Sequence, residues 1–189
     1  MNYKSLFNRF LKLLVSPAKA WKEISGDKES LDVLSAYVYP LIGVCGFVTF
    51  IAEVIRYYGD NQPYEMFRMV ITDCCVMCVA LFGGFFLSAY VVHWAGNSLY
   101  GLKNRLSDVY AFVGYSMSVV FFTYILFPLF ADSRVLLYLL QIYTLSVVWE
   151  GVPVMTDIDD SRKGGYTLIV TAAILCSNIA IYMLFNILM

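Results

Sequence analysis

Apolar residues along this chain are gathered into five long runs that are separated by short polar segments. The runs cover residues 33–52, 74–92, 109–131, 135–156 and 164–189, and Glu150 is the only charged residue inside them. Each run is close to or above the roughly 20 residues that cross a hydrocarbon core of about 30 Å. Because lipid offers no partner to a free backbone amide, such runs must be α-helices or strands of a closed barrel. Barrel strands would alternate polar and apolar residues over about 10 positions, and no such alternation is present.

The pattern therefore predicts an all-α, polytopic membrane protein. The expected transmembrane helices cover residues 33–55, 69–94, 109–131, 134–155 and 166–188. They form one five-helix bundle domain at 32–189, and residues 1–31 form a cytoplasmic amphipathic segment ahead of it. We expect the first span to act as an uncleaved anchor, because the first apolar run starts about thirty residues into the chain and is too long for a signal peptide.

The segment before the first run has the pattern of an amphipathic helix. Within residues 3–15 apolar side chains recur at helical spacing, at Phe7, Phe10, Leu11 and Leu14. Basic side chains fall between them, at Lys4, Arg9 and Lys12. This arrangement predicts a helix that binds the anionic headgroups of the cytoplasmic leaflet. Ser16 and Pro17 then favour the start of a second short helix over residues 18–24, and its Trp21 is expected at the level of the headgroups.

The composition agrees with a membrane protein. Hydrophobic residues make up 60% of the chain and charged residues 14%, whereas an average soluble domain is roughly 45–50% apolar and about 25% charged. The surplus of apolar side chains is therefore assigned to surfaces that face lipid.

Basic residues are distributed unevenly between the polar segments. Of the 13 Lys and Arg residues, all but three lie before the first run or in two of the later connections, at Lys4, Arg9, Lys12, Lys19, Lys22, Lys28, Lys103, Arg105, Arg162 and Lys163. The other three are Arg56, Arg68 and Arg134. By the positive-inside rule, this asymmetry predicts a multi-pass protein of the cell (inner) membrane with a cytoplasmic N-terminus and an external C-terminus.

Small residues at four-residue spacing mark two helix faces. They are Ala80, Gly84 and Ser88 in the second run and Gly114 and Ser118 in the third. Small side chains let helix backbones approach closely in lipid. We therefore expect both faces to contact other helices.

Short motifs of Pro, Gly, Trp and Tyr stand at the ends of the predicted helices. They are SPAKAWKEI at 16–24, AYVYPLIG at 36–43, LSDVYAFVGYS at 106–116, YTLSVVWEGVPVM at 143–155 and GYTL at 165–168. Together they extend over nearly the whole chain and resemble the Yip-one (Ypt-interacting protein) domain family of multi-pass membrane proteins, in its bacterial branch.

This resemblance implies a five-helix fold with a cytoplasmic N-terminus and an external C-terminus. Eukaryotic relatives are associated with prenylated small GTPases and vesicle traffic, and that role does not carry over to a bacterial cell, which lacks the machinery. The chain departs from the bacterial pattern at Glu150, where an aromatic or aliphatic residue is commoner, and at residues 157–159.

The cysteines and the single histidine do not form a catalytic pattern. Cys74 and Cys75 stand four and three residues before Cys78, spacings that share a helix face, with Asp73 beside them, and thiolates bind soft metals. A metal site would need about four ligands, however, and no histidine stands near, so these cysteines are expected to fill space. His93 is expected at the membrane interface. Walker, dinucleotide-binding and zinc-protease patterns are absent, so we expect no cofactor, no metal site and no enzymatic activity.

The end of the fourth run holds the strongest candidate for a functional or structural site, Glu150, Gly151 and Pro153. Pro153 lacks the amide that would bond to the carbonyl of Trp149, so the helix is expected to bend or end there, and Gly151 adds backbone freedom. An acid within a span is a functional-site hypothesis by default. We favour a helix-packing or snorkelling role for Glu150, and a proton or ion site is the alternative.

Glu53 and Asp73 both lie toward the expected external ends of the first two spans. We expect their carboxylates to reach the headgroups, because ionised groups in hydrocarbon are costly. Arg56 and Arg68 are expected to pair with them across the connecting loop.

Two functions remain open. The leading hypothesis is a non-enzymatic scaffold or binding partner in membrane organisation. Its partners would be the lipid bilayer, anionic headgroups at Lys4, Arg9, Lys12 and Trp21, and another membrane protein or a second copy of the chain, with no nucleic acid. The alternative is a small-solute or ion transporter or channel that uses Glu150, which would require polar residues to converge near the membrane midplane.

Reporter fusions or cysteine labelling test the topology. Residue 2 and the 157–163 loop should lie on the cytoplasmic side, and Met189 and the 57–67 loop should lie outside, because basic residues favour the cytoplasm. A cytoplasmic Met189 would contradict the five-span topology.

Overall fold

Every regular element in the described part of the chain is helical. The computed structural model describes residues 3–26, 33–58, 62–130 and 134–188. Its helices are α1 (Tyr3–Val15), α2 (Pro17–Gly26), the π-helical turn η1 (Leu34–Val38), α3 (Tyr39–Tyr57), α4 (Pro63–Tyr100), α5 (Leu106–Ser116), α6 (Ser118–Leu126), α7 (Arg134–Gln141), α8 (Thr144–Met155) and α9 (Asp160–Leu188).

Five segments are long and apolar enough to cross a membrane. They are Leu34–Tyr57, Pro63–Tyr100, Leu106–Leu126, Val135–Met155 and Asp160–Phe185. The predicted all-α bundle with five membrane-spanning segments is therefore confirmed.

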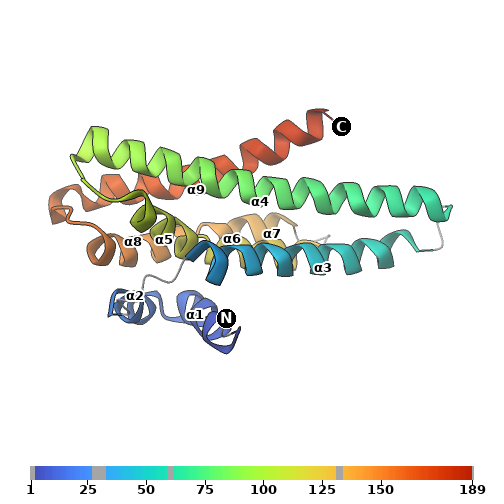
Figure 1. Cartoon of the computed structure of the whole chain (residues 1–189), viewed down its shortest axis with the longest axis horizontal. Helices are drawn as coiled ribbons and strands as arrows, with labels where there is room; N and C mark the ends of the chain where they lie inside the picture. Colours follow the sequence, from blue (N-terminus) through green and yellow to red (C-terminus); the bar gives the residue numbers. More distant parts are fainter. Residues whose placement is uncertain (1–2, 27–32, 59–61, 131–133, 189) are drawn as a thin grey trace.

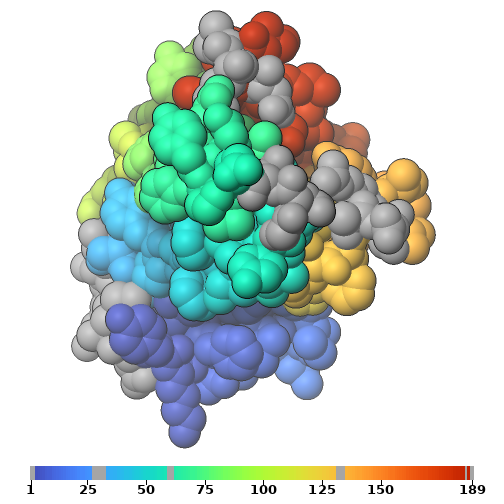
Figure 2. All heavy atoms as spheres, turned by 90° about the vertical axis from the view of Figure 1, so that its right-hand side faces the viewer, coloured from blue at the N-terminus to red at the C-terminus, as the bar shows by residue number. Residues whose placement is uncertain are grey.

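The spans pack side by side into an elongated bundle (Figure 1). α4 packs against α3, α5 and α9, while α8 packs against α9 and α5, and α6 packs against α3. α1 and α2 lie on the outside of this bundle, where α1 contacts α6 and α2 contacts α8 (Figure 1). We call the end where α4 finishes and α9 begins the proximal end, and the end where α3 finishes and α4 begins the distal end. Figure 2 looks onto the distal end.

α4 is longer than a single membrane crossing. It contains 38 residues, roughly 57 Å at about 1.5 Å per residue. The predicted span, 69–94, covers only its apolar middle, and the helix continues past Trp94. It stops at Gly101, whose φ of 67° is a left-handed conformation that glycine adopts without steric penalty. The amide of Leu102 then donates to the carbonyl of Gly96 (3.0 Å), which closes the helix end.

The first span begins with a widened turn. In η1 the amide of Tyr39 donates to the carbonyl of Leu34, five residues back. Pro40 follows, and in a regular α-helix its ring would crowd the carbonyl four residues earlier, so the wider turn relieves that conflict. The turn also directs Tyr37 into the bundle, where its hydroxyl forms a hydrogen bond of 2.6 Å with Ser118 Oγ.

Two spans that the sequence predicts as continuous helices are broken within the bundle. The third divides at Met117, where ψ is 1°, into α5 and α6. The fourth divides between Gln141 and Thr144 into α7 and α8. At the first break Ser118 Oγ donates to the carbonyl of Tyr115 at 2.6 Å. Such side-chain bonds satisfy carbonyls that a helix break would otherwise leave without partners in lipid.

The third span also ends earlier than predicted. α6 ends at Leu126 rather than near residue 131. Pro128 follows two residues later and has no amide to donate to the carbonyl of Tyr124, so the helical hydrogen-bond pattern stops there.

The small-residue faces lie at helix contacts, as predicted. A Cβ at Gly84 of α4 would overlap the side chain of Asn178 in α9, and Ser88 Oγ donates to a backbone carbonyl of α9 at 3.2 Å. A Cβ at Gly114 of α5 would lie 2.9 Å from Val38 Cγ2 in η1. Both faces therefore allow the close backbone approach that packing in lipid requires.

Candidate functional site

Trp21 attaches the N-terminal segment to the bundle. Its side chain is fully buried, and its indole Nε1–H donates a hydrogen bond of 2.8 Å to the backbone carbonyl of Val147 in α8. The ring packs against Phe112 and Tyr115 of α5, at centroid separations of 5.7 and 6.1 Å. The predicted headgroup contact of Trp21 is wrong, because the bundle supplies both an apolar pocket for the ring and an acceptor for its N–H.

The Trp21 ring occupies a notch in α8 that depends on a glycine. A Cβ built at Gly151 would lie 2.6 Å from Trp21 Cε2, 2.7 Å from Trp21 Cζ2 and 2.9 Å from Phe112 Cε2. Both neighbours are buried aromatic rings, which have no flexible end that can move aside. Gly151 therefore has a packing role that the sequence pattern does not indicate.

α1 has two apolar sides. One side packs on the bundle, where Phe10 and Leu13 are buried and the Phe10 ring lies 6.4 Å from that of Phe122 in α6. The other side carries exposed apolar residues at helical spacing, which are Tyr3, Phe7, Leu11 and Val15. The apolar stripe of the sequence is thus divided between a protein-facing and an outward-facing surface.

The three basic residues predicted to touch headgroups differ in their surroundings. Arg9 is half-buried and donates a hydrogen bond of 3.2 Å to the hydroxyl of Tyr115. Lys12 forms an exposed ion pair of 2.6 Å with Glu23 of α2. Lys4 is exposed. Arg9 and Lys12 therefore also connect α1 to the rest of the protein.

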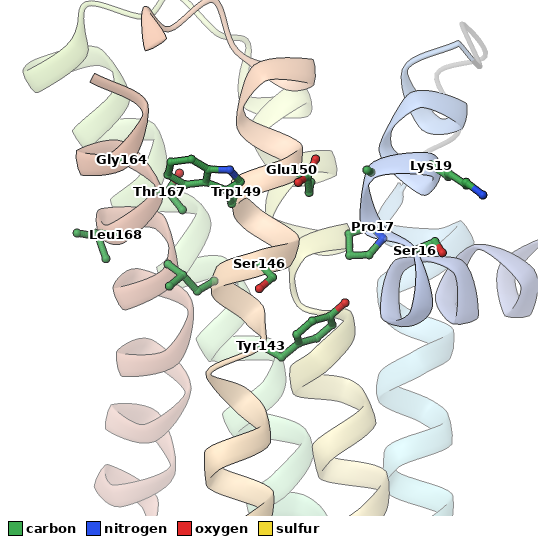
Figure 3. Close-up of a pocket in the computed structure, with 12 residues that line it drawn as sticks. Ser16, Pro17, Lys19, Tyr143, Ser146, Trp149, Glu150, Gly164, Thr167 and Leu168 are labelled. Atoms are coloured by element: carbon green, nitrogen blue, oxygen red, sulfur yellow. The ribbon is translucent and has the colours of Figure 1, made fainter. Parts of the chain in front are cut away.

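An open groove of about 690 Å³ lies between α2, α8 and α9 (Figure 3). Most of its surface is apolar. It is lined by Ser16, Pro17, Ala18, Lys19, Tyr143, Leu145, Ser146, Trp149, Glu150, Gly164, Thr167 and Leu168. The groove thus joins the start of α2, which Trp21 holds in place, to two membrane-spanning helices.

Glu150 is the acidic group of this groove. Its side chain is half-buried and points from α8 toward the start of α2, whereas the Lys19 amine points away from it (Figure 3). Among the residues that the structure describes, no side chain forms an ion pair or hydrogen bond with the Glu150 carboxylate. Thr167 Oγ1, on the α9 wall of the groove, is buried and has no hydrogen-bond partner among the described residues. The Glu150 carboxylate is therefore the charged group that the groove offers to a ligand.

α8 continues through Pro153 and ends at Met155. The amide and hydroxyl of Thr156 both donate to the carbonyl of Val152, at 3.0 and 2.6 Å. The helix therefore does not end at Pro153 itself but within one turn after it.

Two basic residues that the sequence assigns to a loop lie in the first turn of α9. Arg162 donates to the carbonyl of Leu99 at 3.0 Å and its guanidinium lies 5.0 Å from the centroid of the Tyr100 ring. The Lys163 amine lies 4.3 Å from the centroid of the Trp149 ring. These cation–π contacts hold the proximal ends of α4, α8 and α9 together.

The distal end contains a second polar site. Glu53 is only 6% exposed, and Arg56 Nη1 donates to both of its carboxylate oxygens at 2.6 and 2.7 Å. The predicted headgroup contact of Glu53 is therefore wrong, because its charge is neutralised inside the bundle by a residue one turn away on the same helix. Arg68 pairs with Glu65 at 3.6 Å rather than with Asp73.

Asp73 faces the same distal cavity. Its carboxylate accepts a hydrogen bond of 3.5 Å from the Tyr57 hydroxyl. The cavity measures about 260 Å³ and is lined by Thr49, Glu53, Arg56 and Tyr57 of α3, by Asp73, Val76 and Met77 of α4, and by Tyr124, Phe127, Pro128, Tyr138 and Tyr182. Side chains from α3, α4, α6, α7 and α9 thus converge on one site.

Cys45 is buried and Cys74 and Cys78 are half-buried, whereas Cys75 and Cys176 are exposed. Cys45 Sγ donates weakly to the carbonyl of Phe121 at 3.5 Å, and Cys74 Sγ to the carbonyl of Gly46 at 3.9 Å. Within residues 3–26, 33–58, 62–130 and 134–188, no group of three or more His, Cys, Asp or Glu side chains is placed to hold a metal ion.

A family model described as the Yip1 domain matches residues 11–181, which include α2 and nearly all of the five spans. The chain belongs to the Yip1 domain family. No curated protein and no solved structure matches it. The Glu150 groove lies within the matched residues, and so does the lining of the distal cavity except Tyr182.

The sequence singles out Glu150 of this Yip1 domain but indicates neither the groove around it nor the distal cavity. Glu150 stands out because it interrupts an apolar run, and Pro153 marks the helix end. Glu53 and Arg56 stand three residues apart on one helix face, a spacing that indicates an ion pair. The tyrosines of the cavity lie near predicted span ends, where they resemble ordinary interfacial aromatics. Only the three-dimensional arrangement brings them together.

The notch at Gly151 predicts a large effect of one methyl group. Gly151→Ala should lower the free energy of unfolding of the protein in detergent by about 1–3 kcal/mol, because the new Cβ overlaps Trp21 and Phe112. Trp21→Leu should restore part of this loss in the double variant, since the two sites are in contact.

Gly43→Ala is the matched control, because nothing lies within 4 Å of a Cβ built at that position in α3. It should be neutral or slightly stabilising. Equal stability of the Gly151→Ala and Gly43→Ala proteins would show that the notch is not tightly filled.

Proposed function

We propose that this Yip1 domain protein is a non-enzymatic scaffold in membrane organisation, and that it acts by binding a lipid in the groove between α2, α8 and α9. The observation that carries the proposal is the groove itself. It is about 690 Å³ in volume, mostly apolar, and built jointly by the N-terminal segment and two spanning helices. Ligand sites commonly combine such an apolar surface with a few polar groups.

The chemistry of the groove favours a lipid with an ammonium headgroup. Leu145 and Leu168 offer apolar contact for an acyl chain, and Leu168 is 62% exposed on α9. Glu150 supplies a carboxylate with no basic partner among the described residues. An ammonium donor would supply the missing charge, since a charge-assisted hydrogen bond is strongest where water is partly excluded.

The N-terminal segment, 1–31 in the sequence, is proposed to lie on the cytoplasmic leaflet. The outward side of α1 carries Phe7 and Leu11 beside the exposed Lys4. An apolar stripe next to a basic residue is suited to the surface of an anionic bilayer. This placement agrees with the basic asymmetry of the sequence, which favours a cytoplasmic N-terminus and an external C-terminus in the cell membrane.

The motifs at 16–24 and 143–155 support assignment to the bacterial branch of the family. They also form the two sides of the Trp21 contact, because the first contains Trp21 and the second contains Val147 and Gly151. A further membrane protein or a second copy of the chain is a compatible partner, and lipid is the occupant that the groove favours.

The transporter hypothesis has less support. A carrier would need polar groups to converge near the middle of the membrane. Glu150 and Glu53 line separate cavities. Buried apolar side chains such as Ile42, Leu81 and Phe121 pack inside the bundle between these two cavities.

Native mass spectrometry of the full chain, released from a mixture of phosphatidylethanolamine and phosphatidylglycerol, tests this proposal. The wild-type protein should retain phosphatidylethanolamine preferentially. Glu150→Gln should lower this preference by about fivefold, the ratio that corresponds to about 1 kcal/mol for a partly exposed ion pair. Leu168→Trp should reduce retention of both lipids, because the larger ring fills the groove.

Glu65→Gln is the control, since Glu65 lies at the distal end, outside the groove. Thermal stability of each variant is measured in parallel. Unchanged lipid preference in a folded Glu150→Gln protein would reject the lipid assignment, and loss of stability in both Glu150→Gln and Pro153→Ala would indicate a structural role for this helix end.

A further inference from the structure

The distal cavity shares no lining residue with the lipid groove and contains three charged side chains, Glu53, Arg56 and Asp73. Its volume is about 260 Å³, and five helices contribute to its lining. Figure 2 looks onto this end of the molecule, where the start of α4 stands beside the end of α3. Ionisable residues inside a membrane bundle are costly and mark functional sites by default.

The charges in the cavity are unequal. Glu53 and Asp73 are two carboxylates, and Arg56 is the only basic residue in the lining. The Arg56 guanidinium is committed to Glu53, with Nη1 within 2.7 Å of both oxygens. Asp73 is left with the Tyr57 hydroxyl, at a long distance of 3.5 Å. A cation bound beside Asp73 would balance the second carboxylate.

The remaining lining selects the kind of cation. Tyr57, Tyr124, Tyr138 and Tyr182 come from four different helices and surround the space with aromatic rings and hydroxyls. Ring faces attract organic ammonium groups through their quadrupoles. A hard metal ion would instead require six or more oxygen ligands at about 2.3–2.6 Å, or an octahedral set. Asp73 is the only carboxylate of the lining that is not already paired with Arg56.

From these observations we propose that the distal cavity binds a primary alkylammonium group, with Asp73 as its counter-ion and the tyrosines as its walls. The Asp73 carboxylate accepts a hydrogen bond from an N–H of the primary ammonium. A quaternary ammonium has no N–H and cannot donate this bond. Glu53 and Arg56 neutralise each other on α3, so Asp73 remains the carboxylate that the ligand compensates. The same chemistry is present in a free amine and in the headgroup of phosphatidylethanolamine.

Thermal unfolding of the full chain in phosphatidylglycerol nanodiscs tests the proposal with ethylammonium as the probe. Millimolar ethylammonium should raise the midpoint of unfolding in a saturable manner, because a ligand that binds the folded state stabilises it. Tetramethylammonium and potassium at equal ionic strength should give much smaller shifts. Equal shifts with potassium, or no saturable shift with ethylammonium, would overturn the assignment.

Two variants locate the site. Asp73→Asn should weaken ethylammonium binding by about tenfold, as expected for loss of a partly buried counter-ion. Tyr138→Leu removes a half-exposed ring and leaves the Glu53–Arg56 pair untouched, so it should weaken binding severalfold even if Asp73→Asn does not fold. Undiminished binding in a folded Asp73→Asn or Tyr138→Leu protein would overturn the proposal.

Matched controls come from the same end of the bundle. Glu65→Gln and Tyr64→Leu change an acid and an exposed tyrosine outside the cavity and should leave ethylammonium binding unchanged. Weakening by these controls equal to that of Asp73→Asn would show a non-specific surface effect and overturn the proposal.

Repeating the titration in phosphatidylethanolamine nanodiscs identifies the source of the ammonium. A shift that disappears there shows that the lipid headgroup occupies the cavity, and a shift that persists shows that a free amine does. Both outcomes support an ammonium site.

Discussion

The contact between Trp21 and α8 determines how the two parts of this protein fit together. A single indole fills the space left open at Gly151 and donates its N–H to the carbonyl of Val147 at 2.8 Å. Because the ring also packs on Phe112 and Tyr115, it joins α2 to both α5 and α8. Without this contact the start of α2 would have no fixed place beside α8, and the groove that ends at Glu150 would lose one wall. The N-terminal helices are therefore a structural part of the bundle, although their sequence has the pattern of a surface segment.

The spans place charged groups at two separate sites, and the polar side chains buried elsewhere in the described bundle, such as Ser88, Ser118 and Asn178, are uncharged. The Glu150 groove opens beside the N-terminal helices, and the distal cavity is enclosed by tyrosines and by the Glu53–Arg56 pair. Charged groups inside a membrane protein persist when another group or a ligand compensates them. Glu53 has an internal partner, whereas Glu150 and Asp73 have carboxylates that a bound ligand would satisfy. This difference is the reason that binding, rather than transport across the bundle, is the function we propose.

Much of the fold could be predicted from the sequence because lipid imposes simple requirements. Uncharged runs of about 20 residues gave five helices, and the spacing of Gly84 and Ser88 identified a helix contact. The break at Met117 could not be predicted, because it depends on the Ser118 hydroxyl, which bonds to the carbonyl of Tyr115 and to the hydroxyl of Tyr37 only in the folded bundle. The break near Ile142 has no glycine or proline beside it that would have marked it. Burial of Trp21 was also hidden, since an amphipathic helix that packs on protein has the same pattern as one that lies on lipid. The distal cavity needs residues far apart in sequence, from Thr49 to Tyr182, and no local pattern connects them.

Fluorescence of Trp21 as the only tryptophan, in a Trp94→Phe, Trp149→Phe protein reconstituted in vesicles, tests the central contact most directly. A buried indole that packs against protein should emit at short wavelength and resist quenching both by acrylamide and by lipids spin-labelled at the headgroup. The account predicts this result. Strong quenching by the headgroup label would contradict it, because it would place Trp21 at the membrane surface and leave the notch at Gly151 empty.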